Sequence, residues 1–198
     1  MTQQNPNFNS VDHDWHDEKY VADWIARDVA RPERQPLLAE MLALAPFAKD
    51  APIAVLDVGG GNGQVTEALL KAFPNAKVTL QDYSQLMVDE ARKRFAKYGD
   101  QVTYVISDLY DSNWAKSAGG PFDMVVSGIA IHNLREMEPI GAVYGAIHGL
   151  LKPGGVFLNA DHFANYGGID RHVEELRRRG YAKVDAKDGR PGIAAAYK

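Results

Sequence analysis

The feature that most constrains this chain is the glycine-rich segment Asp57-Val-Gly-Gly-Gly-Asn-Gly63, which continues an apolar run that begins at residue 53. Such a run is typical of a strand that is buried on both faces. Glycine allows a tight turn and a close approach of backbone to ligand, and the N–H groups that open the following helix have no partner within it. The segment therefore predicts a strand, a turn and a helix that together bind a nucleotide-like ligand.

Short apolar runs alternate with segments of helical periodicity in the rest of the chain. Strands are expected at residues 53–58, 77–81, 102–106, 122–126 and 156–160. Helix-length segments separate them, which predicts a parallel, doubly wound α/β sheet. Lys152-Pro-Gly-Gly155 is expected to end the last crossover helix before the fifth strand.

The two ends of the chain depart from this alternation. At the C-terminus, residues 169–179 predict a helix, and residues 181–187 and 192–197 predict two strands whose connection is too short for a parallel crossover. We therefore expect an antiparallel C-terminal hairpin. At the N-terminus, residues 1–13 predict a mobile polar arm. One domain, residues 14–198, is expected to follow, with N-terminal cap helices in 14–50 and a core in 51–198.

Composition excludes several classes of function. The chain has 198 residues, a formal net charge of -4, no dense block of Lys and Arg, and no cysteine. The charge argues against a nucleic-acid partner, and the missing thiols exclude disulfides, zinc-thiolate sites and cysteine nucleophiles. No apolar run approaches the roughly 18 residues of a membrane span, and the N-terminus does not resemble a signal peptide. A cytoplasmic protein without a membrane partner is expected.

Two carboxylates follow the glycine loop in the order that a nucleotide site requires. Asp82 ends the second predicted strand and can accept hydrogen bonds from ribose hydroxyls, or it can cap the next helix. Asp108 ends the third strand and can accept from an exocyclic amine, although acidic residues often end strands. Gln64 stands where the dinucleotide motif GxGxxG needs glycine, so a nicotinamide dehydrogenase is disfavoured. Asp57 is interpreted as structural.

These features resemble those of the class I S-adenosylmethionine-dependent methyltransferases. The resemblance is carried by Val55-Leu-Asp-Val-Gly-Gly-Gly-Asn-Gly63, Leu80-Gln-Asp-Tyr-Ser84, Phe122-Asp-Met-Val-Val-Ser127 and Leu150-Leu-Lys-Pro-Gly-Gly-Val-Phe157. It implies S-adenosyl-L-methionine as cofactor and a Rossmann-like sheet of seven strands, mostly parallel, with one antiparallel strand near an edge.

The resemblance also implies roles for individual residues. Gly59 and Gly61 would border the methionine part of the cofactor, and Asp82 would hold the ribose. Tyr83 would pack on the adenine, and Asp108 with Leu109 would meet its edge. Ser127, at the end of the fourth strand, is counted with them. No Asn/Asp-Pro-Pro-Tyr/Phe segment follows that strand, which argues against base-amine methylation, and no carboxylate cluster indicates a metal.

Histidines and aromatic residues are the remaining candidates. His132 and His162 follow the fourth and fifth strands, at the ligand-binding edge, and either can serve as a base or play only a structural part. His148 and His172 are expected to be structural or solvated. The aromatic residues Trp15, Tyr20 and Trp24 predict either a hydrophobic staple, which is favoured, or a lid over the site.

The function predicted from the sequence is methyl transfer from S-adenosylmethionine to an oxygen or nitrogen of a small molecule, by direct in-line displacement. Two alternatives stay open: a non-catalytic module that binds the cofactor, and an enzyme that uses the cofactor for decarboxylation or cyclisation. The sequence leaves the acceptor and the oligomeric state undetermined.

Overall fold

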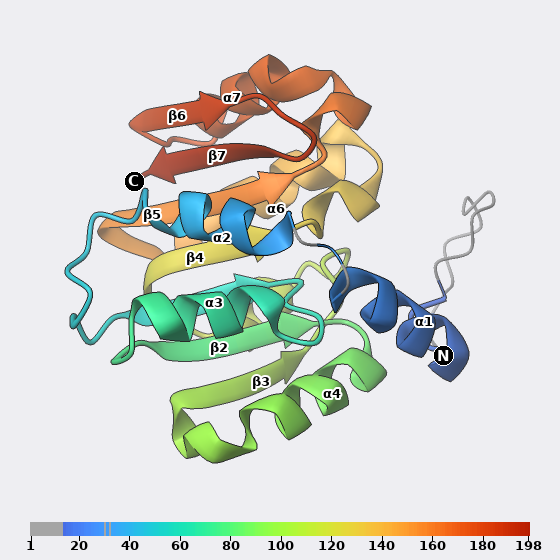
Figure 1. Cartoon of the computed structure of the whole chain (residues 1–198). Coiled ribbons are helices and arrows are strands. Elements are labelled where there is room, and N and C mark those ends of the chain that lie inside the picture. Colours follow the sequence, from blue (N-terminus) through green and yellow to red (C-terminus); the bar gives the residue numbers. More distant parts are fainter. Residues whose placement is uncertain (1–13, 30, 32) are drawn as a thin grey trace.

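The computed structural model describes residues 14–29, 31 and 33–198, so the arm predicted for residues 1–13 lies outside the described residues. Seven strands form one sheet: β1 (Ala54–Val58), β2 (Lys77–Asp82), β3 (Val102–Ile106), β4 (Phe122–Gly128), β5 (Leu151–Asp161), β6 (Lys183–Lys187) and β7 (Gly192–Tyr197). Their order is β3-β2-β1-β4-β5-β7-β6 (Figure 1).

Helices cover both faces of this sheet (Figure 1). They are α1 (Glu18–Val29), α2 (Arg34–Leu42), α3 (Gln64–Ala72), α4 (Gln85–Phe95), α5 (Trp114–Ala118), α6 (Met137–Leu150) and α7 (Gly168–Arg178), with short 3-10 helices η1 (Ala96–Gln101), η2 (Ile131–Leu134) and η3 (Phe163–Tyr166). One hydrophobic core contains Leu38 of α2 and Leu69 of α3. A second contains Ile147 of α6 and Leu176 of α7, so the predicted doubly wound α/β fold is confirmed.

Only β7 runs against the other strands. It pairs antiparallel with both β5 and β6, whereas β1, β2, β3, β4 and β5 pair in parallel. The predicted antiparallel C-terminal pair is therefore confirmed, and the parallel strands all end at one edge of the sheet. Figure 1 shows α1 beside that edge.

Two predicted strand starts were wrong by two or more residues. β5 begins at Leu151 rather than at Val156, because Leu151 pairs with Phe122 and the strand continues, with a register shift, through the Pro-Gly-Gly segment. β6 begins at Lys183 rather than at Tyr181. The Tyr181 side chain is buried instead, and its hydroxyl donates a hydrogen bond to the carbonyl of Tyr144, 3.1 Å away. Pairing and burial decided both boundaries.

Candidate cofactor and acceptor site

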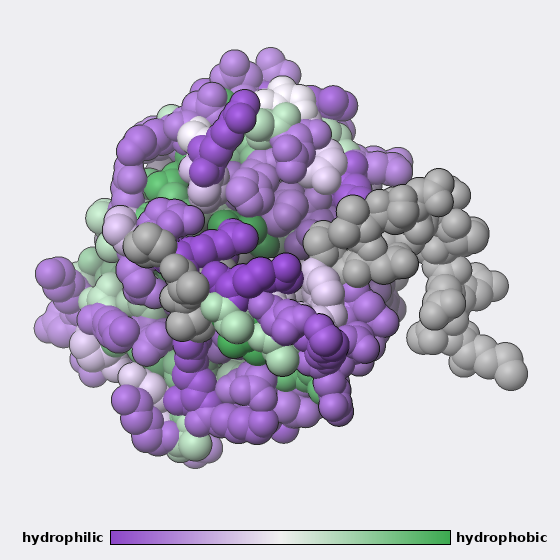
Figure 2. Space-filling view, turned by 45° about the vertical axis from the view of Figure 1, so that its right-hand side comes forward, coloured by the Kyte–Doolittle hydropathy of each residue, from purple (hydrophilic) through white to green (hydrophobic). Residues whose placement is uncertain are grey.

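A cavity of about 960 Å³ opens where the parallel strands end, a volume at the upper end of the range for small-molecule sites. Its wall combines the glycine loop, the ends of β2, β3 and β4, the segment 128–135, and residues of the N-terminal helices. Figure 2 brings this side of the molecule forward and shows a largely hydrophilic surface with small hydrophobic patches. The cavity therefore lies at the edge of the sheet where the parallel strands end.

The glycine loop has a backbone conformation that favours glycine at three positions. Gly59, Gly61 and Gly63 have φ of 64°, 53° and 90°, which residues with side chains rarely adopt. A Cβ on Gly59 would lie 2.4 Å from the Cβ of Ala130, and one on Gly63 would lie 2.2 Å from the Phe95 ring. At Gly61 only the sulfur of Met87 lies near, at 3.9 Å. The loop is therefore packed on the protein at both ends and open to the cavity in between.

Asp82 joins the glycine loop to the start of α4. Its carboxylate accepts the N–H of Gly61 at 2.8 Å and the N–H of Ser84 at 2.9 Å. Burial raises the pKa of Asp82, and these backbone hydrogen bonds oppose that rise. The carboxylate lines the cavity, and it has acceptor positions beyond these two. Asp82 can therefore bind the backbone at the start of α4 and a ligand in the cavity at the same time.

Gln81 is a site residue that the sequence did not single out. Its buried side chain accepts the N–H of Gly59 at 3.1 Å and donates to the carbonyl of Ser107 at 2.6 Å. It therefore ties the glycine loop to the end of β3. Its position immediately before Asp82 is the only sequence signal, since glutamine has no characteristic role at a strand end.

The residues assigned to the adenine lie along the same wall. Tyr83, Asp108 and Leu109 all line the cavity, and the carboxylate of Asp108 accepts the N–H of Tyr110 at 2.9 Å. Burial, with the nearby charges of Asp108 and Asp82, raises the pKa of Tyr83 to about 12. Tyr83 is therefore a neutral, half-exposed ring at the cavity rim.

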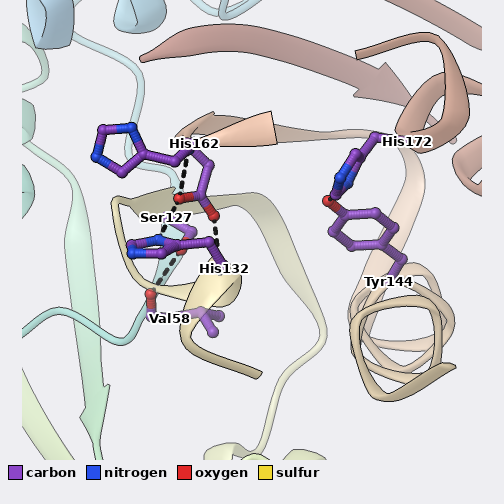
Figure 3. A network of polar contacts seen from close by, with 7 residues as sticks. Val58, Ser127, His132, Tyr144, His162 and His172 are labelled. Atoms are coloured by element: carbon purple, nitrogen blue, oxygen red, sulfur yellow. Dashed lines mark hydrogen bonds and ion pairs between the residues drawn. The ribbon is translucent and has the colours of Figure 1, made fainter. Parts of the chain in front are cut away.

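Two other predicted residues lie behind this wall. The Ser127 side chain is fully buried and donates to the carbonyl of Val58 at 2.9 Å, so the structure does not bring it into the cavity (Figure 3). Asp57 is also fully buried and accepts the Thr66 hydroxyl at 2.7 Å. Burial raises the pKa of Asp57 to about 7. The structure thus places both residues as supports of the loop.

The aromatic residues near the N-terminus form one cluster at the cavity. The Trp15 ring lies 5.3 Å from the Tyr20 ring and 5.4 Å from the Trp24 ring. Trp15 and Trp24 line the cavity, and the Trp15 carbonyl accepts the Ser84 hydroxyl at 2.5 Å. Tyr20 is not among the described residues that line the cavity, and its ring packs edge-on against Trp15. Both the staple and the lid are compatible with this geometry.

His132 and His162 lie side by side, apart from the buried pair of Tyr144 and His172 (Figure 3). Their rings are 5.1 Å apart. The buried carboxylate of Asp161 lies 2.6 Å from Nδ1 of His132 and accepts the backbone N–H groups of both histidines. Because an ionised carboxylate only accepts, Nδ1 carries the proton and Nε2 of a neutral His132 ring is left as an acceptor.

The position of these histidines relative to the cavity is less direct. Among the described residues, Ala130 and Asn133 line the cavity but neither histidine ring does. Burial and the neighbouring His132 lower the pKa of His162, which favours its neutral form. His172, by contrast, is buried with Nδ1 2.8 Å from the Tyr144 hydroxyl. The structural part expected for His172 is confirmed.

The described part of the chain lacks two other kinds of site. No group of three or more His, Cys, Asp or Glu residues is placed to hold a metal ion. No helix in residues 14–198, where described, is long and apolar enough to cross a membrane.

Residues 55–155 match the model of the methyltransferase domain family, which covers half of the chain. The chain belongs to this family. Its seven-stranded sheet, glycine loop and chain-ordered carboxylates are those of the class I S-adenosylmethionine-dependent methyltransferases, so the resemblance drawn from the sequence is confirmed.

Individual relatives agree with this assignment. Over 169 residues the chain is 32% identical to the release factor glutamine methyltransferase of Koribacter versatilis, covering 72% of this chain and 59% of that protein. The chain spans less than two thirds of the length of the curated relatives it matches.

Solved structures share the fold. An O-methyltransferase family protein from Burkholderia thailandensis superposes with a TM-score of 0.75 at 20% identity, covering 93% of this chain and 61% of that one. A second protein from that organism is a 1,6-didemethyltoxoflavin-N1-methyltransferase, with the toxoflavin precursor and S-adenosylhomocysteine bound. Its TM-score is 0.68 at 21% identity, covering 90% of this chain and 86% of that one.

Proposed function

We propose that this protein binds S-adenosylmethionine in the cavity and transfers the cofactor's methyl group to a small molecule. The observation that carries the proposal is the convergence of Gly61, Asp82 and Asp108 on one wall of the cavity. Gly61 leaves room for close approach, Asp82 suits ribose hydroxyls, and Asp108 suits an amine. Calorimetry should show binding of S-adenosylhomocysteine and none of NAD; the reverse result would reject the proposal.

The apolar rings in the cavity wall support a small acceptor. Trp15 and Trp24 line the cavity with flat apolar rings, as is typical of sites for small molecules. The toxoflavin-precursor enzyme is a structural neighbour with a small-molecule acceptor. A protein acceptor is the second candidate, because two relatives are named release factor glutamine methyltransferases. We expect labelled methyl groups to be transferred to the small molecules of a cell extract and not to the proteins of the same extract.

The chemistry asks the protein for alignment and, with a hydroxyl acceptor, for removal of a proton. The bound cofactor supplies an electrophilic methyl group on a sulfonium sulfur. As the acceptor oxygen bonds to the methyl carbon, the S–C electron pair stays on sulfur and the hydroxyl proton leaves. The proposed base for that proton is Nε2 of His132, because Asp161 holds the ring through Nδ1 and the chain neighbours Ala130 and Asn133 line the cavity. His162, beside it, is the second candidate base.

His132→Ala should therefore lower the single-turnover rate with a hydroxyl acceptor by about 10²–10⁴-fold, while the affinity for S-adenosylhomocysteine stays nearly unchanged. His162→Ala should lower it less. With an amine acceptor both losses should be small, since alignment then limits the step. Rates measured from pH 5.5 to 9 test this. If both variants turn over a hydroxyl acceptor at the rate of the unmodified protein, a histidine base is rejected. Turnover that leaves the acceptor without a new methyl group would favour decarboxylation or cyclisation.

A further inference from the structure

Two loops at the cavity are joined by the side chain of Tyr110. The first loop follows β3 and contains Leu109 and Tyr110, and the second follows β4 and contains His132 and Leu134. Because β2 and β1 lie between β3 and β4, the two loops leave the sheet about 14 Å apart. A contact between them therefore needs a long side chain.

Tyr110 makes that contact through its hydroxyl, which donates a hydrogen bond to the Leu134 carbonyl at 2.9 Å. The tyrosine is 48% exposed, whereas Leu134 is buried, so packing holds the ring only in part and the hydrogen bond supplies the specific link. Partial burial, with the nearby charges of Asp108 and Glu136, raises the pKa of Tyr110. The hydroxyl therefore keeps its proton near neutral pH and stays a donor.

The backbone of Tyr110 is held by the residue that is proposed to meet the adenine. The Asp108 carboxylate accepts the N–H of Tyr110 at 2.9 Å, and the Asp108 carbonyl accepts the N–H of Asp111 at 2.9 Å. Tyr110 therefore starts from a fixed turn on the adenine side of the cavity and reaches the loop after β4.

The peptide group that receives this bond is itself bonded to His132. It joins Leu134 to Arg135: its carbonyl accepts the Tyr110 hydroxyl, and its N–H donates to the His132 carbonyl at 3.0 Å. Arg135 and Ile129, on either side of His132, have φ of 62° and 54°, left-handed conformations that are unfavourable for residues with side chains. Such a backbone persists only where surrounding contacts hold it, and the Tyr110 hydroxyl is one of them.

His132 is therefore held from two directions. Asp161 binds its Nδ1 at 2.6 Å and its backbone N–H at 3.0 Å, and the Leu134–Arg135 peptide binds its carbonyl. Building on the proposed function, we propose that Tyr110 is a positioning residue for the base. Its hydroxyl holds the backbone of His132 where Nε2 can take the proton of the acceptor. A displacement of about 1 Å can cost on the order of 100-fold in rate, so this support bears directly on turnover.

Tyr110→Phe tests the proposal, because it removes the hydroxyl and keeps the ring. In the full-length protein saturated with S-adenosylhomocysteine, the NMR signals of the His132 ring, assigned by their loss in His132→Gln, should shift or split. Those of His148 and His172 should stay in place, and the affinity for S-adenosylhomocysteine should stay within about twofold. Tyr104→Phe removes a hydroxyl from β3 outside the described cavity wall, and as the matched control it should shift none of these signals.

Methyl transfer gives a second readout. With saturating labelled cofactor and the small molecules of a cell extract as acceptors, Tyr110→Phe should form O-methyl products about 10–100-fold more slowly at pH 7. Raising the pH to 9 should recover part of this loss, because a hydroxyl that ionises in solution depends less on a base. More cofactor should recover none of it, since the change affects the base and not cofactor affinity.

Unchanged His132 signals in Tyr110→Phe would overturn the proposal, and so would an equal shift in Tyr104→Phe. An unchanged rate of O-methyl formation, or a loss that pH 9 leaves in full, would overturn it as well. Methyl transfer confined to nitrogen acceptors at an unchanged rate would also overturn it, while leaving the proposed methyl transfer intact. Failure of the unmodified protein to bind S-adenosylhomocysteine would instead reject the proposed function itself.

Discussion

At the scale of single residues, the site depends on carboxylates that serve two purposes. Asp82 anchors the glycine loop through Gly61 and faces the cavity. Asp82→Ala should weaken binding of S-adenosylhomocysteine by roughly 1.5–3 kcal/mol, the value of hydrogen bonds to a charged group. Calorimetry measures this, and Asp89→Asn, a partly buried position on α4 that is not among the residues lining the cavity, is the control. Unchanged affinity would remove Asp82 from the site.

Asp57 makes stability depend on pH. Its pKa is raised from 3.8 to about 7 in the folded protein, so the folded state holds the proton more tightly. That contribution is complete below pH 4 and is lost as the pH rises to 7. Asp57→Asn should therefore gain stability relative to the unmodified protein across this window, on the order of 3 kcal/mol by pH 7. Urea unfolding at pH 5, 6 and 7 measures the gain; Asp100→Asn, an exposed position, should show none, and a pH-independent difference would contradict the explanation.

At the scale of elements, α6 and α7 pack closely through a glycine. A Cβ on Gly141 would lie 2.1 Å from a carboxylate oxygen of Glu175, which also binds Arg178 and Arg179. Glycine at this position therefore lets the two helices approach closely. Gly149, in the same helix, has no atom within 4 Å of its Cβ position.

These two glycines form a matched pair for measurement. Gly149→Ala should stabilise the protein by roughly 0.5–1 kcal/mol, because alanine restricts the unfolded chain and favours helix. Gly141→Ala gains the same propensity but must displace the Glu175 carboxylate, so it should fall at least about 1 kcal/mol below Gly149→Ala. Urea unfolding compares them, and equal stabilities would mean that Glu175 moves without cost.

At the scale of the whole molecule, α1 lies beside the edge where the cavity opens and contributes Trp24 to the cavity wall. Trp15→Ala should slow turnover by about tenfold or more and leave the unfolding free energy within about 0.5 kcal/mol, because the sheet is continuous without α1. Lys19→Ala, on the exposed side of α1, is the matched control. Full activity in Trp15→Ala would contradict the lid, and loss of folding would favour the staple.

The fold was predictable because each parallel strand is a short apolar run between helical segments, and the cofactor side of the site because glycines and carboxylates stand at fixed places after those strands. The rest of the cavity wall was not predictable. Arg34 and Arg135 line it from a helix start and from a turn with positive φ, and neither residue carries a local motif. Ser127 was misplaced because its strand continues to Gly128, which turns the hydroxyl toward the Val58 carbonyl instead of the cavity.

Ser84 has a consequence for the order of events. Its N–H binds the Asp82 carboxylate, and its hydroxyl donates to the carbonyl of Trp15 while accepting the N–H of Met87. Ser84 thus contacts both Asp82, the proposed ribose ligand, and Trp15, which precedes α1. A ligand that stabilises the bound position of Asp82 should also stabilise the contact between Ser84 and the segment before α1. By linkage, stabilising that contact should strengthen ligand binding at Asp82. We expect compulsory-order kinetics, with the nucleotide as first substrate on and last product off.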